Sequence, residues 1–305
     1  MLNPLNIWRA LQPLFERMDK VHLGLIAAGV AFYAMFAVFP GLAVLLALWG
    51  LVFDPSMIGA YVAVADEFIP PGASGILHSQ LDGLMAAGRT SLGWTTFVSF
   101  MIATISARAG VESLMRGLNA IHGVRSHSTI FGFILAYVLT LAIVGVALLG
   151  LATIVIVPVV LNVFPLGPAT AWAITALPWV GLFTIVLIGI GIVYRYGPNV
   201  RRPRTALFTW GSLLATLMWA AASIGFSAYL SSFNSYNRIY GSIGAVIALL
   251  MWFYLAGFSV LFGAVVNVEL GRRQRLRQAR RLRKAAQAAA KADAEAAAAG
   301  QQDDA

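Results

Sequence analysis

Long uninterrupted apolar stretches constrain this chain more than any other feature. A helix that crosses the hydrocarbon core of a bilayer needs about 20 consecutive, mostly apolar residues. Six stretches of this kind occur, at residues 24–53, 91–107, 130–162, 169–194, 206–230 and 241–268. Charged residues make up only 11% of the chain, against about 25% in an average soluble domain. We therefore predict an all-α, polytopic membrane protein with six transmembrane helices.

The positions of the basic residues orient these helices. Lysine and arginine are retained on the cytoplasmic side of a membrane, whereas acidic residues have little influence. If the N-terminus is cytoplasmic, 19 of the 21 basic residues fall on that side, and only Arg89 and Arg238 fall outside. We therefore predict that both termini are cytoplasmic. The net charge of +9 is then mainly a signal of topology, and no nucleic-acid partner is predicted.

The remaining segments divide the chain into three parts. Residues 1–23 carry apolar side chains at helical spacing beside three basic ones, which is typical of a helix lying on the cytoplasmic interface. Residues 24–270 form the transmembrane domain, and its outer segment 54–90 is expected to hold short interfacial helices. Residues 271–305 form a cytoplasmic tail that is first basic and then alanine-rich.

Two interpretations of the basic part of the tail remain open. It places eight arginine and lysine residues directly after the last span. Each such residue near a membrane surface adds about 1 kcal/mol of attraction to anionic lipid, so membrane lipids with anionic headgroups are the predicted partners. The alternative is a cluster that only fixes topology. The alanine-rich part is expected to be helical or disordered.

A ladder of charges at the cytoplasmic end of the second span is a candidate gate. Arg108, Glu112 and Arg116 follow one another at i, i+4 spacing, where side chains on a helix meet. The full candidate set is Arg108, Glu112, Arg116, Asn119, Asn267 and Glu269. Glu269 is expected either to pair with Arg108 or Arg116 or to reach headgroup water. The ladder as a whole has the alternative of being a solvated helix end.

The polar stretch SSFNSYNRIYGS, residues 231–242, separates the last two spans and is the candidate binding site. Arg238 is the only basic residue there, and its guanidinium suits an anionic group such as a lipid phosphate. The candidate binding residues are Asn234, Tyr236, Asn237, Arg238 and Tyr240. Tyrosines also anchor helices at membrane interfaces, so a packing turn is the alternative.

No pattern for catalysis accompanies these polar groups. Metal-dependent hydrolysis needs clustered carboxylates and histidines, and the sequence has no H-x-H-x-D-H or D-x-D spacing, no phosphate-binding glycine loop and no G-x-S-x-G motif. With no cysteine in the chain, thiolate metal sites are excluded. We predict no catalytic residues, no metal, no cofactor and no enzymatic activity.

Four segments carry a resemblance to a known family. They read AAGVAFYAMFAVFPGL (27–42), LNAIHGVRS (118–126), YRYGPN (194–199) and GFSAYLSSFNSYNRIYGSIGAVIALLMWFYL (225–255). Together they resemble the YihY/BrkB family of bacterial inner-membrane proteins, in the same order along the chain. The resemblance implies six spans and location in the inner membrane. Members carry labels as a ribonuclease and as a virulence or serum-resistance factor, without an established activity.

This chain departs from the family pattern at two positions. Val265 stands where the family usually has glutamate in G-A-E-x-N, and Ile239 stands where threonine is commoner. The first hypothesis for function is transport or handling of a lipid or an anionic amphipathic small molecule. The second is a non-transporting scaffold for envelope integrity, and the third is a ribonuclease. The oligomeric state stays open.

Overall fold

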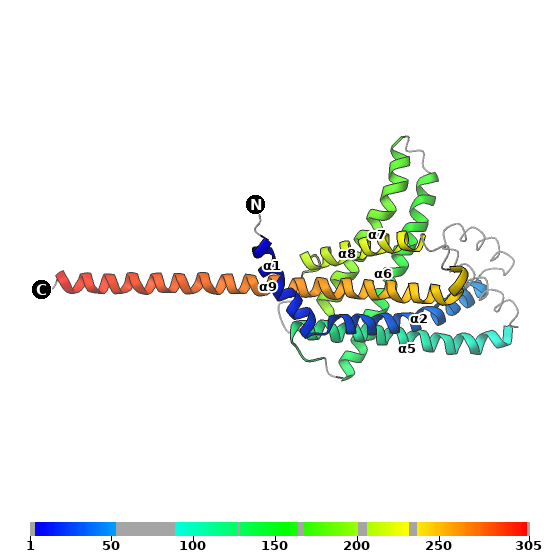
Figure 1. Ribbon diagram of the computed structural model, residues 1–305, viewed down its shortest axis with the longest axis horizontal. Helices are drawn as coiled ribbons and strands as arrows, with labels where there is room; N and C mark the ends of the chain where they lie inside the picture. The colour runs from blue at the N-terminus through cyan, green and yellow to red at the C-terminus, as the bar shows by residue number, and fades with distance from the viewer. Residues whose placement is uncertain are drawn as a thin grey trace.

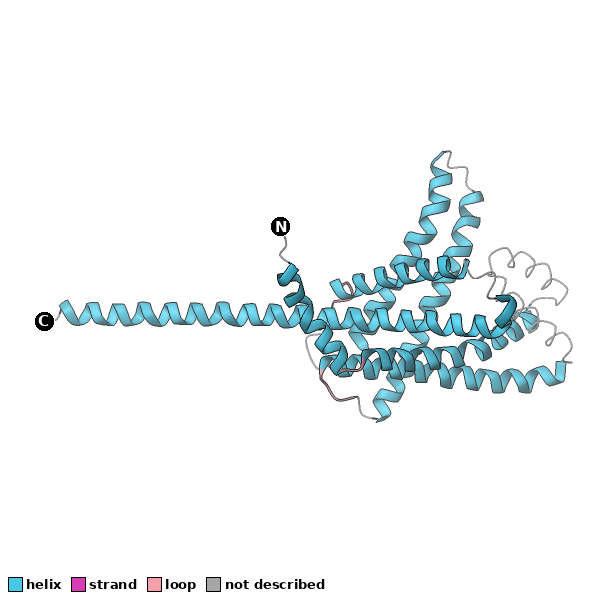
Figure 2. Ribbon diagram, in the orientation of Figure 1, coloured by secondary structure: helices cyan, strands magenta, loops and turns pink. Residues whose placement is uncertain are grey.

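The computed structural model describes residues 4–52, 89–126, 129–163, 168–200, 206–231 and 237–303, and all regular structure in these ranges is α-helical (Figures 1 and 2). The helices are α1 (Pro4–Lys20), α2 (Leu23–Val52), α5 (Arg89–His122), α6 (Thr129–Val163), α7 (Pro168–Tyr196), α8 (Trp210–Ser231) and α9 (Asn237–Asp303). Within these ranges, six helices are long and apolar enough to cross a membrane. The predicted all-α fold with six spans is confirmed. The interfacial helices predicted for 54–90 lie outside the described residues.

Two helices are longer than the apolar stretches that predicted them. The apolar stretch 91–107 belongs to α5, which continues to His122 and so carries the whole charge ladder. The last span continues without a break through the basic segment to Asp303. Alanine, arginine, lysine, glutamine and leucine dominate this extension and are strong helix formers, and no proline interrupts it. The tail is therefore a helical extension of α9 over these residues.

The helices fall into two groups by direction. Figure 1 shows α2, α5, α8 and α9 running along the length of the molecule, while α6 and α7 form a hairpin that crosses them steeply. Helix α2 packs mainly against α5 and α9, and α8 packs mainly against α9. Helix α1 crosses α9 where α9 leaves the bundle (Figure 1).

The buried core lies at one end of the bundle, which we call the basic end. It is the end formed by the last turns of α5 and α7 and the first turn of α8, where α1 crosses α9. The larger buried cluster consists of Leu23, Ala27, Leu114, Leu118, Ile121, Ile190, Val193, Tyr194, Ala215, Leu261, Ala264 and Val265. Elsewhere many apolar side chains are exposed, such as Trp94 and Leu141, as expected of spans that face lipid.

A close approach of α8 and α9 at the basic end depends on two glycines. A Cβ atom on Gly211 of α8 would overlap the carbonyl oxygen of Gly263 on α9, and a Cβ on Gly263 would overlap that of Gly211. Small residues allow backbones to approach in membrane bundles, where lipid is as apolar as the side chains and packing drives association. The pair therefore fixes how closely α8 and α9 pack.

Candidate functional site

The polar residues predicted to form a gate all lie toward the basic end, but the structure divides them into four separate groups. The first is the charge ladder of α5, where Nη2 of Arg108 lies 2.9 Å from Oε2 of Glu112 and Nη2 of Arg116 lies 2.6 Å from Oε1. The predicted i, i+4 contacts are confirmed. One carboxylate therefore holds two guanidinium groups.

Arg108 also joins α5 to α6. Its guanidinium carbon lies 4.2 Å from the ring centre of Phe133 and 5.6 Å from that of Tyr137. Attraction between a guanidinium and an aromatic face strengthens when water is excluded, and the Arg108 side chain is only 19% exposed. Arg116, at 70% exposed, projects from the other side of Glu112. Arg108 thus contributes to packing at the start of the crossing hairpin.

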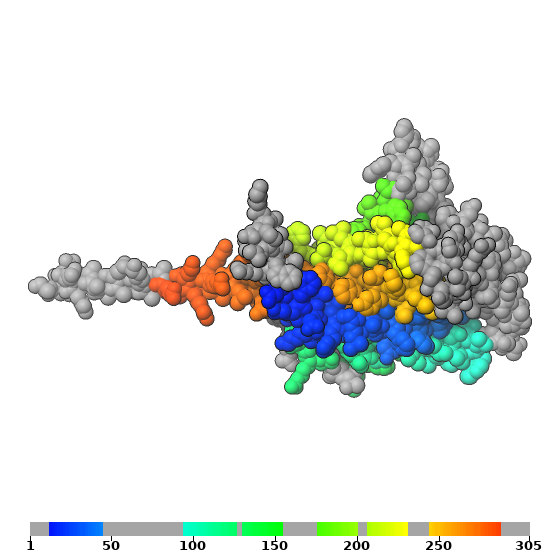
Figure 3. Space-filling model, in the orientation of Figure 1, coloured from blue at the N-terminus to red at the C-terminus, as the bar shows by residue number. Residues whose placement is uncertain are grey.

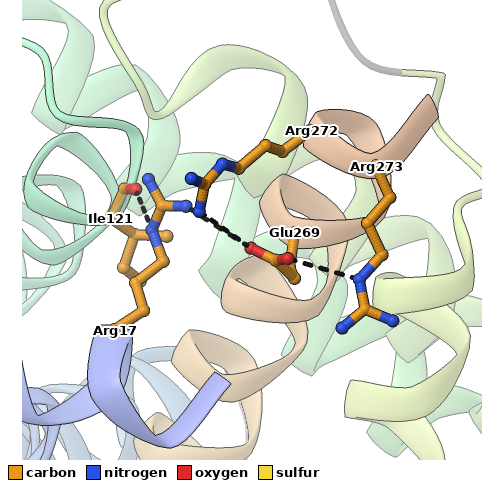
Figure 4. A network of polar contacts seen from close by, with 5 residues as sticks. All are labelled: Arg17, Ile121, Glu269, Arg272 and Arg273. Carbon is orange, nitrogen blue, oxygen red and sulfur yellow. Dashed lines mark hydrogen bonds and ion pairs between the residues drawn. The ribbon is translucent and has the colours of Figure 1, made fainter. Parts of the chain in front are cut away.

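The second group surrounds Glu269 on α9 (Figure 4). Glu269 is 6% exposed, and Nε of Arg273 lies 3.3 Å from its Oε1. Its Oε2 lies 4.0 Å from Nη1 of Arg17 and 3.9 Å from Nη1 of Arg272. Arg17 also donates through Nε to the carbonyl oxygen of Ile121 at 3.1 Å. The group therefore ties α1 to the end of α5 and to α9.

Both expectations for Glu269 were wrong. It pairs with neither Arg108 nor Arg116, and it is buried rather than solvated. The reason is the position of α1, which crosses α9 and carries Arg17 to Glu269 and Ile121. Arg108 is 13 residues from Ile121, about 20 Å along the helix at 1.5 Å per residue, and Glu112 already binds it. The sequence therefore predicted the arginine partners correctly for Glu112, within α5, but not for Glu269.

The third group is centred on Asn267 and caps the start of α8. Thr209 and Ser212 bond reciprocally, with the N–H of Ser212 donating to Oγ1 of Thr209 at 3.0 Å and the N–H of Thr209 donating to Oγ of Ser212 at 2.9 Å. The intervening N–H of Gly211 donates to Oδ1 of Asn267 at 2.8 Å, and Nδ2 of Asn267 donates to Thr209 at 2.8 Å. Backbone N–H groups in the first turn of a helix need such acceptors. Asn267 supplies one from another span.

The fourth group joins two of the segments that resemble the family, residues 118–126 and 194–199. Oδ1 of Asn119, which is 3% exposed, accepts a 2.7 Å hydrogen bond from the backbone N–H of Asn199. Nδ2 of Asn199 donates to the carbonyl oxygen of Arg125 at 3.1 Å. The segments LNAIHGVRS and YRYGPN are therefore in contact. Nothing in their spacing along the chain predicted it.

The candidate binding residues between the last two spans remain a prediction. Asn234 and Tyr236 lie outside the described residues. Asn237, Arg238 and Tyr240 fall in the first turns of α9, with side chains outside the description.

The two ionic groups carry an excess of positive charge. Glu112 and Glu269 are surrounded by five arginines: Arg17, Arg108, Arg116, Arg272 and Arg273. Guanidinium groups with unused N–H donors suit phosphate and carboxylate. Within the described ranges, no three histidine or acidic side chains gather in a way that would hold a metal ion. The chemistry of the basic end therefore favours anions.

Comparison with known proteins gives one family. The family model described as virulence factor BrkB matches residues 14–289. The ribonuclease-like protein YfkH of Bacillus subtilis is 28% identical over 281 residues, covering 87% of this chain and 96% of that protein. A UPF0761 membrane protein of Cronobacter sakazakii is 27% identical over 285 residues, covering 91% and 93%. Another, of Chromohalobacter salexigens, is 31% identical, covering 88% and 65%. No solved structure matches significantly.

Proposed function

This chain belongs to the virulence factor BrkB family of membrane proteins, and on that premise we propose that it is a bacterial inner-membrane protein that binds an anionic lipid or amphipathic molecule and moves it across the membrane. The observation that carries the proposal is the charge excess at the basic end. Five arginines surround two glutamates on the helices that form and lead to that end, and α5 and α9 also expose apolar side chains such as Ile105 and Leu270. An anionic headgroup with acyl chains matches that combination.

The proposed orientation places the basic end at the cytoplasmic surface. Basic residues stay on the cytoplasmic side during insertion. Arg17 of α1 and the arginines of α9 after Glu269 lie at or beyond this end, and Arg108 and Arg116 lie on the C-terminal half of α5, which leads to it (Figure 1). Anionic lipids give the cytoplasmic leaflet a negative surface potential. The basic end would then be the side on which an anionic headgroup is collected or released.

Arg238 is the proposed contact for the same headgroup on the opposite side. It is one of only two basic residues assigned to the outer side by the sequence. A planar guanidinium binds phosphate through paired hydrogen bonds, which an ammonium cannot form. Tyr236, Asn237 and Tyr240 are its proposed companions.

A non-transporting scaffold is the second candidate, and a specific observation favours it. Gly211 and Gly263 bring α8 and α9 into backbone contact at the basic end, and two hollows over the described residues are open at the surface. Tight packing suits a protein that only stabilises the envelope. The ribonuclease-like name belongs to the Bacillus subtilis relative, and we do not extend that activity to this chain.

Reconstitution of the full chain into liposomes tests the proposal. Phosphatidylglycerol with a fluorescent headgroup-proximal label is added, and dithionite, which quenches only the outer leaflet, reports movement between leaflets. We expect protein-dependent movement that Arg238→Ala abolishes and Arg238→Lys restores in part. Arg89→Ala, the other predicted outer arginine, is the matched control and should retain movement. Absence of movement with the unaltered chain would support the scaffold instead.

A further inference from the structure

An open hollow lies on the side of α1 away from Glu269. It has a volume of about 490 Å³ and is formed by the end of α1, the start of α2 and one residue of α9. Figure 3 shows these parts of α1 and α2 lying directly on α9. Phe15, Asp19 and His22 line it from α1 and the following turn, and Leu25 and Phe258 line it from the spans.

The turn between α1 and α2 creates this hollow. Helix α1 ends at Lys20, and His22 takes a left-handed backbone conformation with φ of 51°. The N–H of His22 donates to the carbonyl oxygen of Asp19 at 2.9 Å. Phe15 and Asp19 are spaced i and i+4, so they share one side of α1, and His22 in the turn after α1 lines the same hollow. Arg17, which contacts Ile121 and Glu269, lies on another side.

The lining is polar at one rim and apolar at the other. Asp19 and His22 are exposed beside the interfacial helix, while Leu25 is 74% exposed at the start of the first span. Phe258 continues a column of rings along α9, with its centre 6.1 Å from that of Tyr254 and 6.3 Å from that of Phe262. This gradient matches the boundary between a lipid headgroup and its acyl chain.

The charge at the polar rim selects the headgroup. Among the described residues that line the hollow, Asp19 is acidic and none is lysine or arginine. A carboxylate accepts strong hydrogen bonds from an ammonium group, and the faces of Phe15 and Phe258 also attract cations. The imidazole of His22 offers an N–H donor to phosphate or ester oxygens.

We infer that this hollow is a binding site for a phospholipid whose headgroup carries a primary amine, with its ammonium at Asp19, its phosphate toward His22 and an acyl chain along Leu25 and Phe258. The site differs from the arginine groups of the basic end in position and in sign of charge. It goes beyond the proposed function, because binding here needs no movement of lipid between leaflets.

Native mass spectrometry of the detergent-purified full chain tests this site. The protein is titrated with phosphatidylethanolamine and with phosphatidylglycerol of identical acyl chains. We expect the amine lipid to occupy one site more tightly, and Asp19→Asn to weaken that binding about tenfold, as the loss of a charge-assisted hydrogen bond implies. Leu25→Ala, at an exposed position, should weaken both lipids equally and by less.

Glu16→Gln is the matched control. It removes the same charge from the same helix, but Glu16 accepts a hydrogen bond from Gln12 at 2.9 Å and does not line the hollow. Its binding of the amine lipid should equal that of the unaltered chain. The inference is overturned if the unaltered chain shows no preference for the amine lipid, or if Asp19→Asn and Glu16→Gln have the same effect. Either result leaves the leaflet-movement assay unaffected.

Discussion

The side-chain oxygen of Asn119 accepts a 2.7 Å hydrogen bond from the backbone N–H of Asn199, 80 residues further along the chain. This bond joins the end of α5 to the segment that follows α7. Asn119 is buried, so water cannot easily replace the contact. The relationship explains why two polar segments of the resemblance, otherwise distant in sequence, belong to one structural feature.

Replacing Asn119 tests how much this bond contributes to stability. Asn119→Ala removes the acceptor and leaves the N–H of Asn199 without its partner, which costs about 1–3 kcal/mol for a buried group. Asn199→Ala keeps that backbone N–H and loses only the exposed side-chain bonds to the carbonyl oxygens of Arg125 and Ser126, for about 0.5–1 kcal/mol. The midpoint of thermal unfolding in detergent should therefore be lower for Asn119→Ala than for Asn199→Ala. The reverse order would show that the backbone bond is unimportant.

The spans were predictable from sequence because their formation depends on local properties. Length and hydropathy are enough to locate α6 and α7, and the contacts of Glu112 follow from helical spacing alone. The contacts of Asn119 and Glu269 were not predictable in the same way. Asn119 joins the end of α5 to the segment after α7, and Glu269 of α9 meets Arg17 of α1. Each contact depends on how elements far apart in the chain meet at the basic end.

The wrong predictions for Glu269 are the most informative. The sequence placed it correctly near the end of the last span, and an unpaired glutamate there is expected to reach headgroup water. Its burial follows from Arg17, which α1 delivers from the other end of the chain. The amphipathic pattern of residues 1–23 predicted a helix, and α1 is one. The amphipathic pattern gave no information on which basic residue of α1 would point into the bundle.

Loss of the Glu269 carboxylate should loosen α1. In Glu269→Gln, Arg272 and Arg273 can turn to solvent because they are 64% and 38% exposed, whereas Arg17 is 26% exposed and held at Ile121. Because partial exposure screens the ion pairs, we expect the free energy of unfolding to fall by about 1–2 kcal/mol, less than for the loss of a fully buried pair. Limited trypsin digestion should cleave faster after Arg17 and Lys20.

Two comparisons make this test specific. Glu112→Gln removes a carboxylate whose two arginine partners, Arg108 and Arg116, both lie on α5, and should leave cleavage near Arg17 unchanged. The double variant Arg17→Met with Glu269→Gln should cost less than the sum of the two single effects, since the two residues act as a pair, although Arg17→Met also removes the bond to Ile121. Additive effects would mean that they contribute to stability independently.

The contact between Gly211 and Gly263 should tolerate no side chain. Gly211→Ala or Gly263→Ala places a methyl group against the facing carbonyl oxygen and forces α8 and α9 apart; overpacking of this kind costs about 1–3 kcal/mol. Gly225→Ala on α8 is the matched control, because nothing lies within 4 Å of its added Cβ. That substitution should raise helix stability by up to about 1 kcal/mol. Thermal unfolding in detergent of the three variants measures the difference.

Reporter fusions test the proposed orientation of the six spans. An enzyme active only outside the cytoplasm should give signal after residue 80 and none after residues 124, 200 and 290, because 19 of the 21 basic residues then remain inside. A second reporter, active only in the cytoplasm, should give the opposite pattern. The fusion after residue 200 is the most discriminating, since it follows the fourth span and the contact of Asn199 with Asn119. External activity there would place α5 and α7 ends on opposite sides of the membrane, which that hydrogen bond does not allow.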